Sequence, residues 1–311
     1  MTSCQREQTV LEALTPVAAR LLERHLGSAR EWFPHELVPW SRGRDFESGW
    51  TWTADEAPEL DLAVRSALYV NLLTEDNLPF YFRDIERMFG ADGPWGEWVR
   101  RWTAEEGRHS IVIRDYLTVS RMIDPVELER GRMNQVSGGV VPSPESAVDA
   151  LVYVALQELA TRVAHMNTAK AMTDRAGYEV LKRVAADENL HLLYYRDLVA
   201  AAIEVDPSLV AEAVERQVKN FEMPGTGIPG FQTHARAIAT CGIYDLAVHH
   251  DQILEPVLIR NWAIDQMTGL DGPGEKAREG ALHHMQRLGR LAKRRASRLA
   301  EKAQAAASES G

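Results

Sequence analysis

One pattern of acidic residues and histidines occurs twice in this chain and constrains its fold more than any other feature. Each copy consists of a Glu, about thirty further residues and then the motif Glu-x-x-His. The copies are Glu75 with Glu106 and His109, and Glu158 with Glu188 and His191. A Glu plus a Glu-x-x-His, given twice, is the ligand set with which a bundle of four helices holds two iron ions. The pattern therefore predicts an all-α fold around a buried dinuclear site.

The candidate ligands share helix faces with apolar residues. Four segments have helical periodicity. They run over roughly residues 60–90, 95–120, 145–173 and 176–204. In the second segment Trp102, Glu106, His109 and Ile113 are spaced by four, three and four residues, so they lie on one face. The fourth segment repeats these spacings around its own Glu and His, which indicates that the acids face the core.

Burial of four ionised carboxylates needs compensating cations. Two Fe(II) ions would neutralise them, and His and carboxylate ligands without thiolates suit iron better than structural zinc. The thirty-residue gaps also fit two antiparallel helices joined by a short turn, because each arm is then about 14 residues, or ~20 Å, long. We therefore expect two Fe ions per chain.

Several neighbours of the expected ligands are candidates for supporting roles. Asp187 and Glu105 each precede a ligand Glu and could hold the outer nitrogen of a ligand His on another helix. Thr161 lies one turn after Glu158 in the third helical segment, and it shares a stripe with Arg162 and His165. Its hydroxyl could steer protons or oxygen, or could bond back to its own helix. His165 lies further along, where a core histidine is expected and a supporting role stays open.

The rest of the chain is expected to add helices to one domain over residues 1–311. Its parts are an N-terminal helix and loop (1–58), the metal-binding four-helix core (60–204), additional helices (205–305) and a frayed tail (306–311). A Gly/Ser/Pro-rich loop is expected over 134–144. Pro79 cannot donate to the carbonyl of Glu75, so the first core helix is expected to kink at its ligand.

Bulk properties exclude some classes of protein. The formal net charge of −10 argues against a nucleic-acid partner. No apolar run approaches the ~18–20 residues that cross a bilayer, and the first residues lack the pattern of a secretory signal. Cys4 and Cys241 match no metal or redox spacing, which fits a reducing compartment. We expect a soluble, cytoplasmic protein without a membrane span.

Four strings around these residues resemble one known family, the soluble acyl-carrier-protein desaturases of the stearoyl type, and its actinobacterial branch most closely. The strings are LLTEDNLPFYF, WVRRWTAEEGRHSIVIRDYL, LQELATRVAHMNTAKA and ADENLHLLYYRD. The resemblance runs from about residue 8 to residue 270, and the order and spacing of all six ligands match. It implies a ferritin-like four-helix bundle core with additional flanking helices.

The resemblance also implies roles for single residues. Glu106 and Glu188 would bridge the two irons, while Glu75 and Glu158 would be terminal ligands. It implies supporting roles for Asp187 and Trp102, and it puts Thr161 beside the oxygen site. Trp32 looks like the surface tryptophan of the family's proposed electron path.

The activity implied by the resemblance is desaturation of a fatty acyl chain attached to acyl carrier protein, with O2 as co-substrate and ferredoxin or a similar electron donor. A homodimer is also implied. One alternative is a di-iron hydroxylase or oxidase of a carrier-bound chain. A second alternative, from another class of protein, is a ferritin-like iron-oxidising or storage protein, although a ferritin bundle needs only about half this length. A third is a radical-generating subunit like that of ribonucleotide reductase. The last needs a Tyr near the iron, for which Tyr194 and Tyr195 are candidates.

One residue departs from the family's pattern. The family usually reads Glu-Glu-Asn-Arg-His-Gly where this chain reads Glu105-Glu106-Gly107-Arg108-His109-Ser110. A Gly inside a helix costs ~1 kcal/mol relative to Ala. The ligands are intact, so the departure bears on acyl-chain length and double-bond position rather than on metal binding.

Overall fold

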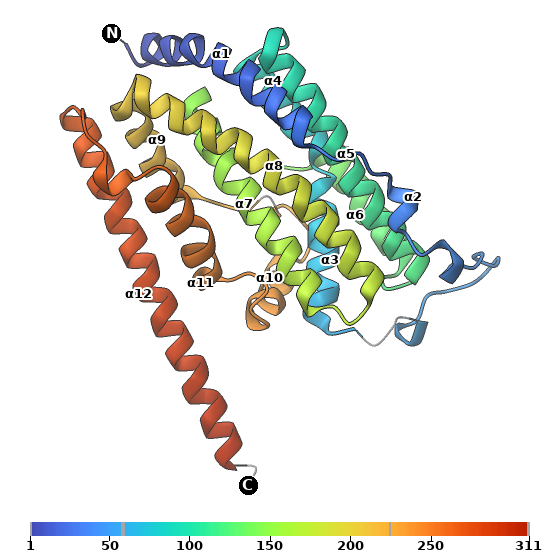
Figure 1. Ribbon diagram of the computed structural model, residues 1–311. Helices are drawn as coiled ribbons and strands as arrows, with labels where there is room; N and C mark the ends of the chain where they lie inside the picture. Colours follow the sequence, from blue (N-terminus) through green and yellow to red (C-terminus); the bar gives the residue numbers. More distant parts are fainter. Residues whose placement is uncertain (1, 57–59, 224, 310–311) are drawn as a thin grey trace.

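The computed structural model describes residues 2–56, 60–223 and 225–309, and these residues form helices and connecting loops without a strand. Four helices make the core (Figure 1). They are α3 (Leu62–Glu75), α5 (Gly93–Ser120), α7 (Ala147–Ala171) and α8 (Arg175–Val205). α3 packs on α5 and α7, and α8 packs on the same two helices, which closes a four-helix ring. The predicted all-α bundle is confirmed.

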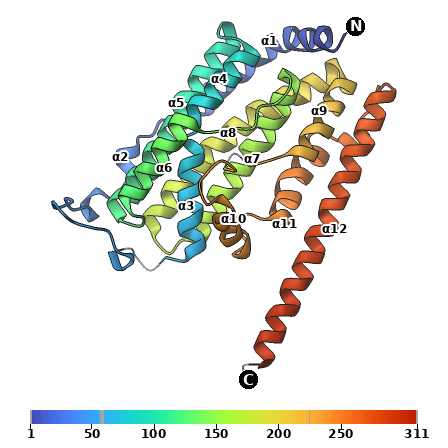
Figure 2. The same ribbon diagram turned by 180° about the vertical axis from the view of Figure 1, so that it is seen from behind.

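Further helices flank this core. They are α1 (Ser3–Ser28), α2 (Pro34–Leu37), α4 (Leu78–Phe89), α6 (Pro125–Gly138), α9 (Pro207–Asn220), α10 (Phe231–Thr240), α11 (Leu246–Val248) and α12 (Gly272–Glu309). α1 lies against α5 and α8, α10 lies against α3, and α9 packs on both α7 and α12 (Figure 2). The short segments η1 (Trp40–Arg42), η2 (Ala54–Glu56) and η4 (Ile264–Gln266) are single 3₁₀ turns.

Acidic side chains fix where core helices begin. The carboxylate of Asp61 accepts a hydrogen bond from the backbone N–H of Ala63 at 2.7 Å, and that of Asp174 accepts one from Gly177 at 3.3 Å. First-turn N–H groups have no carbonyl partner within the helix, so these caps stabilise the starts of α3 and α8.

The first predicted core helix is two helices, which corrects the expected kink. α3 ends at Glu75, and α4 begins at Leu78. Pro79 occupies the first turn of α4, where its missing N–H would have no partner in any case. The chain therefore changes direction directly after its first ligand, instead of bending within one helix.

Two segments differ from the sequence prediction. α6 covers the first part of the expected loop at 134–144, and it starts with an acidic cap, since Asp124 accepts from the N–H of Val126 at 2.9 Å. The segment η3 (His249–Asn261) is π-helical, and the N–H of Trp262 at its end bonds to the carbonyl of Val257, five residues back, at 3.0 Å. π-helices usually span a single turn and are common at functional sites.

A polar layer separates two apolar cores. On α5 the buried apolar residues up to Trp102 belong to one core and residues 112–117 to the other, and the polar residues 105–110 lie between. α8 has the reverse order, with residues 180–184 in the second core and the polar residues 187–191 before the first core begins. All four core helices thus bring buried polar side chains to one level.

α12 packs on α9 at its start, and its second half projects beyond the bundle, so the two chain ends lie far apart (Figure 1). The helix runs to Glu309, past residue 306 where the tail is predicted to begin, and residues 310 and 311 lie outside the described part.

Cys4 and Cys241 are free and exposed. Among the described helices, none combines the length and apolar character that a bilayer span requires.

Candidate metal centre

The six predicted ligands meet in the polar layer. Two groups of four residues each bring one ligand atom per residue within 4.8 Å of one another. The groups are Glu75, Glu106, His109 and Glu188, and Glu106, Glu158, Glu188 and His191. None of these six residues is more than 6% exposed. Because Glu106 and Glu188 belong to both groups, the arrangement suits two metal ions that share two carboxylates.

His191 directs its two ring nitrogens to different acids. Its Nδ1 lies 2.9 Å from Oε1 of Glu106 and 3.6 Å from Oε2 of Glu158. Its Nε2 lies 3.0 Å from Oε2 of Glu105, outside the two groups. With a metal ion held by the ligand groups, Nδ1 would be the ligand atom and Nε2 would donate its proton to Glu105.

His25 is a functional residue that the sequence prediction missed. It lies in the last turn of α1 with 4% exposure, and its Nε2 donates to Oε2 of Glu105 at 2.9 Å. Its ring also stacks on that of His191, with centroids 5.8 Å apart. The signal was present in the sequence, because His25 continues the buried stripe of Ala18 and Leu21 at spacings of three and four. Glu105 therefore connects α1 to a ligand histidine.

His109 likewise directs its two ring nitrogens to different acids, one of which belongs to α8. Its Nδ1 lies 3.2 Å from Oε2 of Glu106, and its Nε2 lies 3.5 Å from Oδ2 of Asp187. Burial alone would raise the pKa of Asp187, but the His109 imidazole, a hydrogen bond from Trp32 and the Arg183 charge lower it to about 2. Burial likewise opposes ionisation of Glu105, yet hydrogen bonds from the two histidines that it contacts lower its pKa. Both outer acids are therefore carboxylates that orient a ligand imidazole.

Trp32 lies beneath the surface, which corrects the expected surface position. It is 6% exposed, and its Nε1 donates to Oδ2 of Asp187 at 2.8 Å. The guanidinium groups of Arg108 and Arg183 cover its ring, at 4.8 and 5.5 Å from the centroid. The ring is nearly parallel to the His109 imidazole, with centroids 6.5 Å apart. Trp32, Asp187 and His109 thus form a continuous contact path from beneath two surface arginines to the ligands.

The remaining predicted supporting residues also lie in or beside the polar layer. Trp102 donates from Nε1 to Oε1 of Glu158 at 3.1 Å. Thr161 donates to the carbonyl of Gln157 at 3.1 Å, so its hydroxyl bonds back to its own helix, and it lines a small cavity that reaches Glu75.

Of two neighbours on α7, His165 has the supporting position that the sequence left open, whereas Arg162 lies elsewhere than expected. His165 accepts a hydrogen bond from Asn71 at Nδ1 (3.2 Å) and lies 3.0 Å from Oε1 of Glu75 at Nε2, so it supports a ligand directly. Arg162 does not face the ligands. It lines a groove on the outer side of the α7–α8 pair, which corrects its expected place on the metal-facing stripe.

Tyr194 and Tyr195 belong to neither ligand group. The Tyr194 ring stacks on Trp98 with centroids 3.6 Å apart, and the hydroxyl of Tyr195 accepts a hydrogen bond from Nε1 of Trp98 at 3.0 Å. Both residues are buried members of the apolar core. Packing explains their positions.

Buried atoms without partners indicate that cations fit this site. Among the described residues, Oε2 of Glu158, Oε2 of Glu188 and Nδ1 of His191 have no hydrogen-bond partner. Such atoms are rare in folded proteins and call for an explanation such as an ion. Burial and the nearby charge of Glu188 raise the pKa of Glu158 well above its ordinary value. Two divalent cations would offset the four ligand carboxylates, and the nitrogen and oxygen donors suit iron.

Comparison with known proteins gives a consistent picture. The family model described as "Fatty acid desaturase" matches residues 6–310. A Mycobacterium tuberculosis protein named acyl-(acyl-carrier-protein) desaturase DesA1 is 41% identical over 280 residues, which cover 87% of this chain and 82% of that protein. The chloroplastic acyl-(acyl-carrier-protein) desaturase 6 of Oryza sativa subsp. japonica is 31% identical over 322 residues, covering 96% and 74% of the two chains.

A solved structure extends the comparison to the fold. The X-ray structure of the acyl-ACP desaturase DesA2 from Mycobacterium tuberculosis H37Rv has a TM-score of 0.70 and 25% sequence identity, and covers 86% of this chain and 98% of that one. The ferritin-like helical fold expected from the resemblance is confirmed. With a family model matched over nearly the whole length and a relative at 41% identity, this chain belongs to the fatty acid desaturase family and is an oxidoreductase.

Proposed function

We propose that this protein is a di-iron, O2-dependent desaturase that introduces a cis double bond into a fatty acyl chain attached to acyl carrier protein, in fatty acid biosynthesis. The observation that carries the proposal is the pair of ligand groups that share Glu106 and Glu188. Glu75 and His109 would complete one iron site, and Glu158 and His191 the other. The names of the relatives support the substrate class.

The proposed reaction removes two hydrogens from adjacent methylenes while O2 is reduced to water with two further electrons. Unactivated C–H bonds resist acid–base chemistry, so the iron pair would supply the oxygen chemistry when bound. The chain's own part is to fix the ligands. Glu105 and Asp187 orient the two imidazoles, and the indole N–H of Trp102 orients Glu158.

A narrow apolar cavity supports the proposed acyl site. A space of about 30 Å³ touches Glu75 and Thr161, and a second of about 90 Å³ continues from it toward α10. The two spaces share the lining residues Val70, Asn71, Ala164, Met223 and Phe231. Met223 and Phe231 line both spaces, so their side chains would have to move aside to admit a long acyl chain. A channel this narrow would present one pair of carbons beside Glu75.

The path through Trp32, Asp187 and His109 supports a route for electrons from ferredoxin or a similar donor. Its contacts are continuous, with the Trp32 indole hydrogen-bonded to Asp187 and the Asp187 carboxylate beside His109. Arg108 and Arg183 lie over Trp32 and share the single carboxylate of Asp187, which leaves this end of the path net positive and would suit an acidic electron carrier.

An exposed apolar patch supports the proposed homodimer. Arg114 of α5 donates to Glu129 of α6 at 2.7 Å, which connects the two helices. Five large apolar residues are exposed on α5, on α6 and directly after α6. They are Ile111, Val126, Met133, Val136 and Val140. Contiguous exposed apolar residues of this kind mark protein–protein contacts, and a second copy of the chain is the partner that we propose.

One assay tests the proposed reaction. The purified iron-loaded protein is mixed with ferredoxin, its reductase, O2 and stearoyl or palmitoyl acyl carrier protein, and the acyl product is analysed by mass spectrometry. We expect the loss of two hydrogens. A gain of one oxygen would assign the hydroxylase alternative instead. An unchanged acyl chain together with rapid iron uptake would support the ferritin-like alternative and overturn the desaturase proposal.

A further inference from the structure

A groove of about 480 Å³ lies on the outer face of the α7–α8 pair, where η3 forms its third wall. The residues of α7 and α8 that line it, such as Leu159 and Leu192, are sequence neighbours of ligands on the opposite face. The groove is therefore separate from the metal centre and from the apolar cavity at Glu75. Its volume falls in the range of about 300–1,000 Å³ that small-molecule sites occupy.

Arg162 projects into this groove without a counter-ion. The residue is half-buried, and no hydrogen bond or ion pair reaches its guanidinium from the part of the chain that the structure describes. Burial lowers its pKa, and no neighbouring charge opposes that shift. A partly desolvated cation without a partner is costly, so its retention indicates an anion that binds to it.

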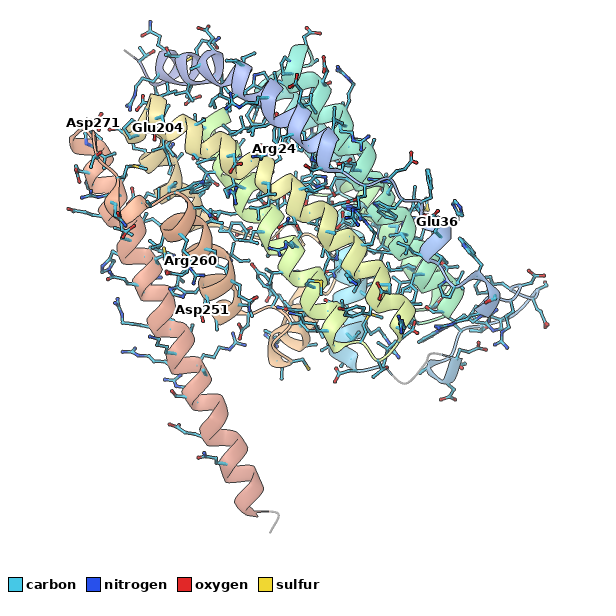
Figure 3. The ribbon with its side chains drawn as sticks, viewed as in Figure 1. Arg24, Glu36, Glu204, Asp251, Arg260 and Asp271 are labelled. Carbon is cyan, nitrogen blue, oxygen red and sulfur yellow. The ribbon has the colours of Figure 1, made fainter. Side chains whose placement is uncertain are left out.

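The other lining charges reinforce Arg162. Arg260 and Lys170 add two cations, against the single lining carboxylate of Asp251, whereas Arg196 also lines the groove but pairs with Asp197 at 2.7 Å. The two labelled residues Arg260 and Asp251 mark the two ends of η3 in Figure 3. Asp251 is turned to solvent and pairs with His250 at 2.6 Å. The groove is thus positive on a chain whose formal net charge is −10.

We propose that this groove binds a phosphate ester, with its phosphate group held by Arg162 and Arg260. Guanidinium groups bind phosphate through paired, charge-assisted hydrogen bonds. The amides of Asn189 and Asn261 line the same space and offer further donors. A phosphate monoester has three terminal oxygens and a charge near −2, which suits two guanidiniums and two amides better than a carboxylate does.

The organic part of the ligand would lie along the apolar wall of the groove. Leu159 and Val163 of α7, Leu192 of α8 and Pro256 of η3 form that wall. Pro256 and Arg260 are four residues apart on η3 and both line the groove, so one element supplies both an apolar contact and a cation. The site takes a small amphiphilic phosphate rather than a bare ion.

Isothermal titration calorimetry on the iron-loaded, full-length protein tests this site, in a buffer free of phosphate and sulfate. The probes are phenyl phosphate and, as the carboxylate counterpart, benzoate, and the iron content is measured before and after titration to exclude extraction of metal. We expect phenyl phosphate to bind at least about tenfold more tightly than benzoate, because it engages two guanidiniums.

Three variants assign the binding to the groove. Arg162→Gln and Arg260→Gln should each raise the Kd for phenyl phosphate about tenfold or more, whereas Arg295→Gln, an equal charge change on the exposed part of α12, should leave it within about twofold. Arg260 is exposed, so Arg260→Gln decides the matter even if Arg162→Gln does not fold. Equal affinities in all three variants, or equal binding of benzoate and phenyl phosphate, would overturn the proposal.

Discussion

At the scale of single residues, the departure at Gly107 has a simple structural setting. A Cβ built on Gly107 would meet only Cδ2 of Leu78, at 4.0 Å. The position thus has room for a side chain, and no contact requires glycine there. The helical backbone at this point carries a cost in conformational entropy without a compensating close approach.

Gly107→Ala is therefore expected to stabilise the protein by up to about 1 kcal/mol, read from the urea midpoint followed by circular dichroism. Gly96→Ala on the same helix is the matched control, because its Cβ would lie 1.9 Å from the carbonyl oxygen of Ala91 and must destabilise. A loss of stability in Gly107→Ala as large as that in Gly96→Ala would contradict this interpretation.

His25 carries the second prediction at this scale. Removal of its ring leaves the buried Glu105 carboxylate with one fewer donor and loosens the orientation of His191. We expect His25→Ala to lower the affinity for iron by about 10–100-fold, measured by competition with a chelator. His35→Ala, at an exposed position, should leave the affinity unchanged. Wild-type affinity in His25→Ala would refute its positioning role.

The six candidate ligands could be proposed from the sequence because they repeat one pattern of a Glu, about thirty residues and a Glu-x-x-His, and Asp187 could be proposed because it directly precedes Glu188. His25 could not be predicted in the same way. Its partner Glu105 is eighty residues away in the chain, and only the packing of α1 on α5 brings them together. A surface position for Trp32 was implied by the family resemblance, and the local sequence could not correct it because its covering arginines, Arg108 and Arg183, come from two distant helices.

At the scale of elements, α5 ends in a left-handed residue that also anchors a loop. Arg121 has a φ of 54°, a conformation that favours glycine. Its guanidinium donates to the carbonyls of Arg44 and Asp45 at 3.2 and 3.1 Å, and it lies over the rings of Phe46 and Trp50. The side chain thus compensates for backbone strain by fixing the loop that precedes η2.

Arg121→Gly should release this loop without straining the helix end. We expect trypsin to cleave at Arg44 roughly tenfold faster or more, since hydrogen bonds to a charged group are lost. Arg121→Ala should release the loop equally and cost a further ~1 kcal/mol or more in unfolding free energy, because Ala is strained at positive φ. Unchanged cleavage in both variants would contradict the anchoring role.

The elements themselves were only partly predictable. The bounds of α5, α7 and α8 could be predicted to within a few residues, because the apolar stripes of these helices are long and continuous. The start of α6 has the same Asp-Pro signal as α9, but its apolar stripe is weak: the sequence predicts no helix there, and the last residues of α6 fall in the loop expected over 134–144. The π-helical hydrogen bonding of η3 leaves no distinct trace in sequence periodicity. The break between α3 and α4 depends on two residues, Asp76 and Asn77, beside a Pro that fits a kink equally well.

At the scale of the whole molecule, the apolar patch on α5 and α6 carries a prediction about assembly. Met133 is 69% exposed at the centre of the α6 stripe. We expect the wild-type protein to sediment as a dimer and Met133→Glu to shift it toward the monomer, by more than tenfold in dissociation constant. Val205→Glu, at a 40% exposed position on another face, is the control. A wild-type monomer, or a dimer insensitive to Met133→Glu, would contradict the proposed interface.

The polar layer between two apolar cores is the feature of the whole molecule on which the proposed function depends. We propose that this layer holds two bridged iron ions, so iron stoichiometry with Mössbauer spectroscopy is the most direct test. We predict about two irons per chain in one magnetically coupled pair, and loss of that pair in Glu188→Ala, because Glu188 belongs to both ligand groups. A single uncoupled iron in the wild-type protein, or an intact pair in Glu188→Ala, would contradict the assignment.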